Sequence, residues 1–271
     1  MRGFCEWLLL LLALCGSTSG LHSSIHCNLR EGRASQIDAG SGQVFGVNPS
    51  NATFTVTEHG LLSYPGKLKE VSPGPNGIWA VKSNNRAARW LRDNWVEIGG
   101  HLTRIDAGGN HIVAGIINDA VRCLPKSKII QADVNQEVEW DHMEGKMKHI
   151  ACGRWGCWAV DGKGQAYFRH GITEDSCVGS SWTEEGRGFS KIEAGTDGDV
   201  YGLSNDQRIY RRVGISKQQP AGTGWALVEL EPHFQGIKDM SYDLRTLWIV
   251  TPDFSVFKCL TSSKLQHNEE E

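Results

Sequence analysis

The chain has 271 residues, a formal net charge of −3 and 32 glycines. Acidic and basic residues are interspersed, so it has neither the basic stripe that binds a nucleic-acid backbone nor the polybasic cluster that binds anionic lipid. The length allows one or two domains, and the many glycines with few helix-like apolar periods predict short strands joined by turns.

The N-terminus has the layout of a secretory signal peptide over residues 1–20. Arg2 is followed by an apolar run from Trp7 to Leu14 and then by small residues up to Gly20. This run is shorter than the roughly 20 residues that a membrane-spanning helix needs. We therefore expect a secreted, extracellular protein that is not inserted in a membrane.

A glycosylation sequon agrees with this compartment, and a polar C-terminal segment is expected to lie outside the fold. Asn51-Ala52-Thr53 forms a glycosylation sequon, which predicts a glycoprotein. Residues 261–271 are polar and end in three glutamates, a composition typical of disordered segments.

A repeat of roughly 40 residues runs through residues 21–260. Each repeat begins with an apolar anchor residue, followed after a turn by a second apolar run such as Ile78-Trp79-Ala80-Val81. The anchors of repeats 1 to 6 are Ile37, Val71, Ile105, Ile150, Ile192 and Ile237. A third run follows a polar turn. A fourth is marked by Trp95, Trp140, Trp182 and Trp225, with Leu61 in the same phase of repeat 1.

The continuous apolar second runs indicate strands that are covered on both faces. Four-stranded blades packed around an axis provide this cover and leave only short, protected edges. The sequence therefore predicts an all-β fold, a six-bladed β-propeller in which Trp79, Trp158 and Trp248 pack between blades. Repeat 6 lacks a fourth run, so we expect the N-terminal strand, residues 25–29, to supply it and close the ring.

Six cysteines follow the signal peptide, and an even number in an exported chain favours disulfides. Ring closure brings one pair together, a tight turn joins the second pair, and the third pair follows by elimination, although six cysteines allow many connectivities. The expected pairs are Cys27 with Cys259, Cys152 with Cys157, and Cys123 with Cys177.

The repeats resemble those of a known family. Met147-Lys148-His149-Ile150 followed by Gly156-Cys157-Trp158-Ala159-Val160 has the form of a tectonin repeat, and Leu68 to Val81 has the same form. With the Ile-Asp-Ala-Gly motifs at Ile37 and Ile105 and the cysteine pattern, residues 25–260 resemble the fish-egg lectins, a tectonin-repeat β-propeller family. Repeat 6 departs from the pattern by the sequence Asp239-Met240-Ser241-Tyr242 after its anchor.

The resemblance implies a multivalent lectin of innate defence that binds N-acetylglucosamine-containing glycans. It also implies recognition of bacterial lipopolysaccharide or cell-wall polysaccharide, self-association into a homo-oligomer, and bound calcium as an optional feature without an assigned metal site.

Seven residues are candidates for carbohydrate binding. A sugar ring stacks its apolar face on an aromatic side chain, and its hydroxyls bond to Asp, Asn or backbone groups. Trp155 lies in the turn between Cys152 and Cys157, where a structural plug is the alternative role. Polar residues that end the second runs would share one face of the ring; they are Asn48, Asn118, Asp119, Asp161, Asn205 and Asp206. Ordinary turn chemistry is their alternative role.

Asp38, Asp106 and Glu193 follow the anchors in the innermost strands, where we expect solvated charges along the central channel. Holding a cation is the alternative, although calcium needs about six to eight oxygen ligands. No catalytic site and no required cofactor are expected, because the chain has no zinc-protease helix motif, nucleophile elbow, phosphate loop or singular carboxylate pair.

Two functions remain, a multivalent lectin and a secreted propeller scaffold that docks a protein partner. Repetition favours the lectin. A millimolar sugar complex is worth only about −4 kcal/mol, and linked sites raise the avidity for a repetitive surface.

Overall fold

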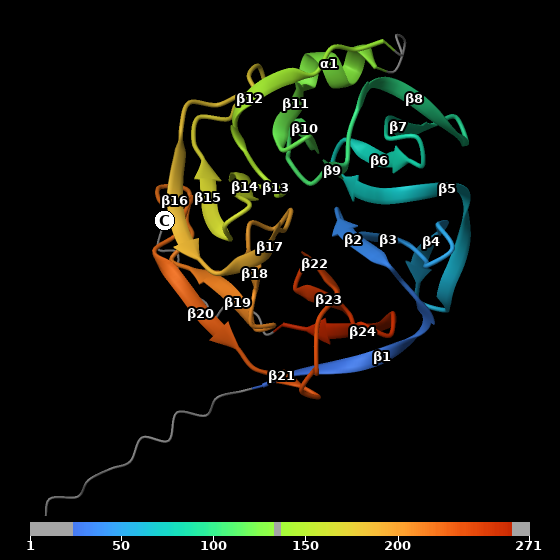
Figure 1. Ribbon diagram of the computed structural model, residues 1–271, viewed down its shortest axis with the longest axis vertical. Helices are drawn as coiled ribbons and strands as arrows, with labels where there is room; N and C mark the ends of the chain where they lie inside the picture. Colours follow the sequence, from blue (N-terminus) through green and yellow to red (C-terminus); the bar gives the residue numbers. More distant parts are fainter. Residues whose placement is uncertain (1–23, 133–136, 262–271) are drawn as a thin grey trace, which may run out of the picture.

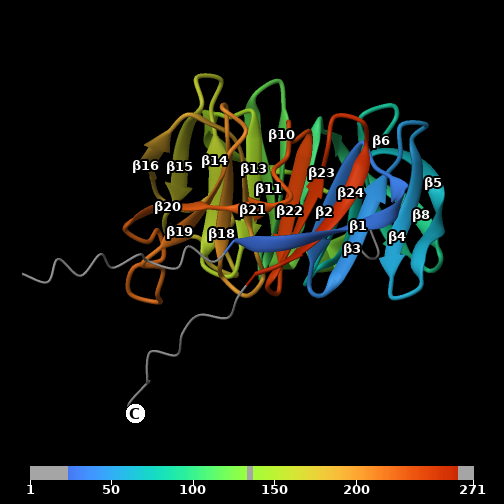
Figure 2. The ribbon, with the colours of Figure 1, turned by 90° about the horizontal axis from the view of Figure 1, so that it is seen from below.

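A computed structural model of the protein describes residues 24–132 and 137–261. The signal peptide predicted for residues 1–20 and residues 262–271 of the predicted tail lie outside the described residues. The strands gather in five sheets around a central axis (Figure 1). Figure 2 shows the same ring edge-on, with strands running between its two faces. The fold is all-β and propeller-like.

Three sheets hold one repeat each. Repeat 3 forms β9 (Arg104–Asp106), β10 (Ile112–Ile117), β11 (Ala120–Pro125) and β12 (Asp141–Lys146). Repeat 4 forms β13 (His149–Gly153), β14 (Gly156–Val160), β15 (Gln165–Arg169) and β16 (Trp182–Arg187). Repeat 5 forms β17 (Phe189–Ala194), β18 (Val200–Ser204), β19 (Ile209–Val213) and β20 (Gly224–Val228). A short helix that the sequence pattern did not predict, α1 (Lys126–Gln131), lies between β11 and β12.

A seven-stranded sheet holds repeats 1 and 2, because the long strand β5 belongs to both. The sheet contains β2 (Gln36–Gly40), β3 (Gln43–Val47), β4 (Ala52–Thr57), β5 (Gly60–Gly74), β6 (Gly77–Lys82), β7 (Arg86–Leu91) and β8 (Asn94–His101). The first half of β5 pairs with β4 and its second half pairs with β6. It is therefore the outermost strand of repeat 1 and the innermost strand of repeat 2.

The fifth sheet brings together segments that are far apart in the sequence. It contains β21 (Leu230–Glu231), β1 (Ile25–Arg33), β24 (Ser255–Leu260), β23 (Thr246–Val250) and β22 (Asp239–Asp243). β1 pairs antiparallel with β24, and Cys27 faces Cys259 in this register. Their Cα atoms are 4.1 Å apart and a disulfide joins the two side chains.

The other two expected disulfides are also present. Cys152 and Cys157 are cross-strand neighbours in β13 and β14, with Cα atoms 4.0 Å apart. Cys123 of β11 bonds to Cys177, which lies between β15 and β16.

The predicted anchor of repeat 6 is wrong. Ile237 precedes β22, and Met240 occupies the anchor position instead. Met240 pairs with Ile249 on the second strand, as Ile37 pairs with Gly46 and as Ile150 pairs with Ala159. The connection that precedes β22 contains an apolar residue, Ile237, close to the expected spacing. The sequence pattern therefore pointed to Ile237 and not to Met240 of the strand.

Six buried clusters form the core of the described residues, and each lies between two consecutive repeats. Trp79 of repeat 2 packs against Trp140 of repeat 3, with ring centroids 6.2 Å apart. Trp158 of repeat 4 packs against Trp225 of repeat 5 at 5.7 Å. Trp248 is 3% exposed. The predicted packing role of the second-strand tryptophans is confirmed.

Candidate functional site

Three grooves open at equivalent places between consecutive repeats, and we name them grooves 1, 3 and 5 after the repeat that forms most of their wall. Groove 1 has a volume of about 630 Å³, and its lining includes Arg33, Asn48 and Phe54. Groove 3 has a volume of about 350 Å³, and its lining includes His101, Arg122 and Trp140. Groove 5 has a volume of about 460 Å³, and its lining includes Asn205, Tyr210 and Trp225.

One wall of each groove contains a glycine at the end of the preceding fourth strand. Gly100 has a φ of +104°, a left-handed conformation that favours glycine, and an added Cβ would lie 2.7 Å from the ring of Trp140. The indole Nε1 of Trp140 donates a hydrogen bond to the carbonyl of Gly99. The indole of one repeat is thus bonded to the carbonyl before a glycine of the previous repeat, and we call this arrangement the tryptophan clamp.

The clamp recurs around the ring. The Nε1···O distances are 2.7 Å for Trp95 to Pro65, 2.7 Å for Trp182 to Glu144 and 2.6 Å for Trp225 to Glu185. In repeat 1 the side chain of Leu61 lies against Gly32 in place of an indole. The fourth-strand tryptophans therefore join neighbouring repeats.

The turn between the second and third strands forms another part of the groove wall. Asn51 holds this turn in the left-handed region with a φ of 61°, which Asn tolerates better than most residues. Its carbonyl accepts a hydrogen bond from the Leu68 amide of repeat 2 at 3.0 Å. In the same way, the carbonyl of Asp119 accepts a hydrogen bond from the Met147 amide. The carbonyl of Phe254 accepts one from the Ala34 amide. Each turn thus fixes the start of the next repeat.

The structure places the predicted polar residues in these turns. The Oδ1 atom of Asn48 accepts from the amides of Ser50 and Ala52, and Asp161 bonds to its own turn in the same way. Both side chains therefore have the ordinary turn role that was the alternative to carbohydrate binding. Asn48 nevertheless lines groove 1.

The remaining four polar candidates divide between two repeats. Asn205 and Asp206 line groove 5, where Asp206 forms an ion pair with Arg208 at 3.2 Å. Asn118 and Asp119 form the equivalent turn of repeat 3, and the Asp119 carboxylate pairs with Lys148 at 2.8 Å.

Trp155 lies apart from these residues, because the turn between β13 and β14 is at the opposite end of β14 from Asp161. Its indole packs on the loop of repeat 5, where a Cβ added to Gly198 would lie 2.3 Å from the Trp155 Nε1 atom. The guanidinium of Arg154 lies 4.8 Å from the ring centroid. The structure therefore does not bring Trp155 together with the polar candidates.

Several groove residues are not among the candidates predicted from the sequence, including Phe54, Tyr210, Arg33 and Arg187. A signal for the two arginines was present in the sequence, because a basic residue follows a glycine of the same phase in each of five fourth strands. The aromatic residues gave a weaker signal, because the repeat predicts the third strand but does not indicate which of its side chains line a groove.

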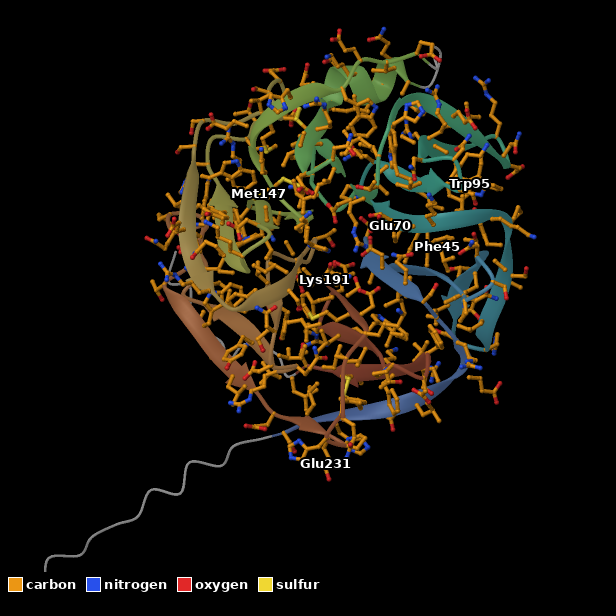
Figure 3. All side chains as sticks on the ribbon, viewed as in Figure 1. Phe45, Glu70, Trp95, Met147, Lys191 and Glu231 are labelled. Carbon is orange, nitrogen blue, oxygen red and sulfur yellow. A yellow bond between two sulfur atoms is a disulfide. The ribbon has the colours of Figure 1, made fainter. Side chains whose placement is uncertain are left out.

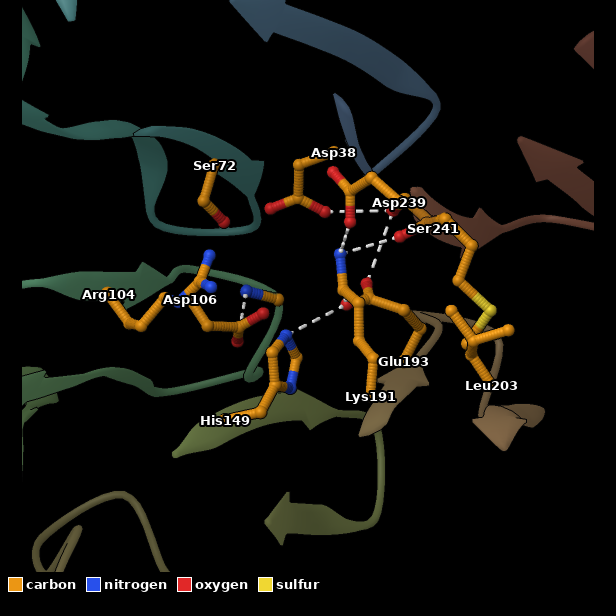
Figure 4. A network of polar contacts seen from close by, with 12 residues as sticks. Asp38, Ser72, Arg104, Asp106, His149, Lys191, Glu193, Leu203, Asp239 and Ser241 are labelled. Carbon is orange, nitrogen blue, oxygen red and sulfur yellow. Dashed lines mark hydrogen bonds and ion pairs between the residues drawn. The ribbon is translucent and has the colours of Figure 1, made fainter. Parts of the chain in front are cut away.

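The central channel contains a buried polar network in place of the predicted solvated charge (Figure 4). Asp106 is 8% exposed and Glu193 is 6% exposed. Among the described strands, the innermost strands of different sheets form no ladder with one another, so carboxylates reach across to their edge amides. Asp106 accepts from the Cys152 amide at 2.8 Å, and Glu70 accepts from the Ile105 amide at 3.2 Å.

The charges of this network are concentrated near the axis, where Figure 3 shows Lys191 and Glu70. The Lys191 Nζ atom lies 2.5 Å from an Asp239 oxygen and 3.2 Å from a Glu193 oxygen. Burial raises the pKa of Glu70 to about 7, although Arg104 opposes the rise. Burial also raises the pKa of Asp38 to about 6, against the opposing charge of Lys191.

Within residues 24–132 and 137–261, no group of three or more His, Cys, Asp and Glu side chains could hold a metal ion. No helix of this described part is long and apolar enough to cross a membrane.

The Tectonin domain family matches residues 33–252. A fish-egg lectin from Cyprinus carpio is 34% identical over 243 residues, which cover 87% of this chain and 99% of the carp protein. A tectonin beta-propeller repeat-containing protein from Drosophila melanogaster is 27% identical over 92 residues, which cover 31% of this chain and 7% of the fly protein. A solved virginiamycin B lyase from Staphylococcus aureus has a TM-score of 0.54 at 17% identity, covering 83% of this chain and 80% of the lyase, and shares the fold alone. The chain therefore belongs to the tectonin family.

Proposed function

We propose that this protein is a secreted, multivalent lectin, built as a six-bladed propeller that β1 closes. In this proposal it binds N-acetylglucosamine-type sugars of microbial surfaces in its inter-repeat grooves. The observation that carries the proposal is the recurrence of one groove design, an aromatic or apolar wall beside a polar turn. The 34% identity to a carp protein named a lectin supports carbohydrate binding.

Groove 5 offers the chemistry that a sugar needs. Tyr210 and Trp225 supply aromatic surface for the apolar face of a pyranose ring, and Asn205 and Asp206 supply polar groups for hydroxyl and acetamido groups. In groove 1, Phe54 and Phe254 take the aromatic role and Asn48 the polar role. Both volumes lie within the range of about 300–1,000 Å³ that small ligands occupy.

Several weak sites on one ring would act together on a repetitive glycan, raising avidity by about 10²–10⁴-fold. Lipopolysaccharide and cell-wall polysaccharide are such surfaces, and self-association of the chain would multiply the sites further. The three disulfides support an oxidising, extracellular compartment. The exposed Asn51 of the sequon is open to glycosylation. No catalytic role is proposed.

The test is calorimetric titration of the disulfide-intact protein with N-acetylglucosamine, its trisaccharide and glucose. We expect heat with the N-acetyl sugars, more than one site per chain, and none with glucose. Tyr210→Ala should remove one site while the remaining sites keep their affinity. Leu244→Ala, which shortens an exposed side chain away from the grooves, is the matched control.

Unchanged stoichiometry in the folded Tyr210→Ala variant would rule out groove 5 as a sugar site. Absence of heat with every N-acetyl sugar up to tens of millimolar would overturn the lectin proposal. Docking of a protein partner would then be the function to test.

A further inference from the structure

A basic residue follows a glycine of the same phase in five successive fourth strands, next to last in four of them and in the middle of the long strand β5. The dipeptides are Gly32-Arg33, Gly66-Lys67, Gly100-His101, Gly145-Lys146 and Gly186-Arg187. All five basic side chains are exposed. Many other basic residues pair with carboxylates, for example Lys82 with Glu97 and Arg211 with Asp199, but these five form no ion pair with any acidic residue of the described chain. Four lysine and arginine cations and the imidazole of His101 therefore lie at corresponding places around the ring without an ion-pair partner among the described residues.

Arg187 is the best positioned of these cations. Its Nε atom donates to the Oε1 atom of Gln165 at 3.2 Å, and Gln165 is only 9% exposed. Gln165 in turn donates to the carbonyl of Gly186. The two terminal nitrogens of Arg187 have no partner among the described residues. A guanidinium with two free terminal nitrogens matches the paired oxygens of a carboxylate or phosphate.

Arg33 has an equivalent place in groove 1. Its guanidinium carbon lies 5.3 Å from the ring centroid of Phe254, and one of its nitrogens donates to the carbonyl of Asp253 at 2.9 Å. Arg33 and Phe254 both line the groove. The groove thus presents a cation directly beside an aromatic wall.

The acidic groups near the grooves limit the inference to grooves 1 and 5. The lining of groove 1 contains no carboxylate, and the one carboxylate of groove 5, Asp206, is paired with Arg208. Groove 3 differs, because Glu139 lies in its lining together with His101. Arg122 also lines groove 3, but the Glu139 carboxylate would oppose an anion there.

We propose that grooves 1 and 5 select anionic saccharides, in which a phosphate or carboxylate on the sugar contacts Arg33 or Arg187. The sugar ring lies on the neighbouring aromatic residues. This inference rests on the proposed lectin function and narrows its ligand class.

The experiment compares three sugars by calorimetry in low salt: neutral N-acetylglucosamine, its 6-phosphate, and N-acetylmuramic acid, which carries a carboxylate. We expect at least one anionic sugar to bind about three- to fivefold more tightly than the neutral one. This preference should disappear in the Arg33→Gln/Arg187→Gln double variant and shrink in high salt. The matched control is Arg92→Gln/Lys217→Gln, which removes two positive charges from exposed residues outside the grooves.

The outcomes separate this inference from the lectin proposal. Equal affinity for the neutral and both anionic sugars overturns the anionic preference and leaves the lectin function standing. A preference that survives in the double variant, or is lost equally in the control, overturns the roles of Arg33 and Arg187. Absence of binding by all three sugars overturns both proposals. A preference for only the phosphate or only the carboxylate supports the inference and identifies the anionic group.

Discussion

The indole Nε1 of Trp225 donates a hydrogen bond to the backbone carbonyl of Glu185, 2.6 Å away in the preceding repeat. A Cβ added to the next residue, Gly186, would lie 3.0 Å from the same nitrogen. The indole therefore needs both the exposed carbonyl and the missing side chain. This relationship couples two positions about one repeat apart in the sequence, so the glycine and the tryptophan form one structural unit.

The tryptophan clamp predicts a cost for a methyl group at its glycine. Gly100→Ala would place a Cβ 2.7 Å from Trp140 on a residue with a φ of +104°. We expect a loss of about 2–4 kcal/mol in the free energy of unfolding, because strain of the backbone and a steric clash act together. Gly60→Ala is the matched control, since its φ is +121° but nothing lies within 4 Å of the added Cβ. Chemical denaturation of both variants should show the larger loss for Gly100→Ala, and equal losses would contradict the clamp.

The hydrogen bond of the clamp can be tested separately. Trp182→Phe keeps an aromatic ring but removes the bond to the Glu144 carbonyl. We expect a loss of about 1–2 kcal/mol from the lost bond and the smaller ring. Trp155→Phe makes the same chemical change at an indole outside the clamp. If thermal denaturation gives the same loss for both variants, the bond contributes nothing specific.

Two of the three disulfides, Cys27–Cys259 and Cys152–Cys157, should differ in their contribution to stability. The Cys27–Cys259 bond spans 232 residues of sequence and the Cys152–Cys157 bond spans 5. The loop-entropy model assigns about 5 kcal/mol to the first and about 2 kcal/mol to the second. We therefore expect Cys27→Ala/Cys259→Ala to unfold at lower denaturant than Cys152→Ala/Cys157→Ala. The reverse order would show that local packing, and not chain closure, determines the effect.

The repeat pattern predicted the strands well, because apolar periodicity and turn residues act locally. Repeat 6 shows where such a prediction fails. Ile237 is apolar and lies near the correct spacing, yet only the pairing of Met240 with Ile249 identifies the strand residue. Pairing between strands is a property of the folded sheet that a single strand does not contain.

The candidate site was less predictable, because its residues meet only across repeats. Asn48 was recognisable from its turn, but Arg33 precedes repeat 1 and belongs to the same groove. The prediction of solvated carboxylates in the central channel was wrong for a related reason. Asp106 was expected in solvent, but the unpaired amide of Cys152 on the next repeat gives it a buried partner.

The last prediction concerns the pH dependence that the channel network imposes. Glu70 is 8% exposed, and burial raises its pKa from 4.5 to about 7. Because its pKa is higher in the folded state, its stabilising contribution is complete below about pH 4.5 and is lost as the pH rises through 7. The raised pKa of Asp38 acts in the same direction. The lowered pKa of buried His149 acts oppositely, because its contribution is present above its ordinary value of 6.5 and is lost at lower pH.

Glu70→Gln isolates the first of these contributions. The amide oxygen of Gln can still accept the Ile105 amide, but the side chain no longer titrates. We expect the free energy of unfolding of the variant, relative to the parent protein, to rise by about 1–3 kcal/mol between pH 5 and pH 8. Glu58→Gln, at an exposed glutamate, should follow the parent protein at both pH values. If urea denaturation gives parallel pH profiles for Glu70→Gln and the parent, Glu70 is charged in the folded state near neutral pH. The positive charge of Arg104 would then lower the pKa of Glu70 by more than burial raises it.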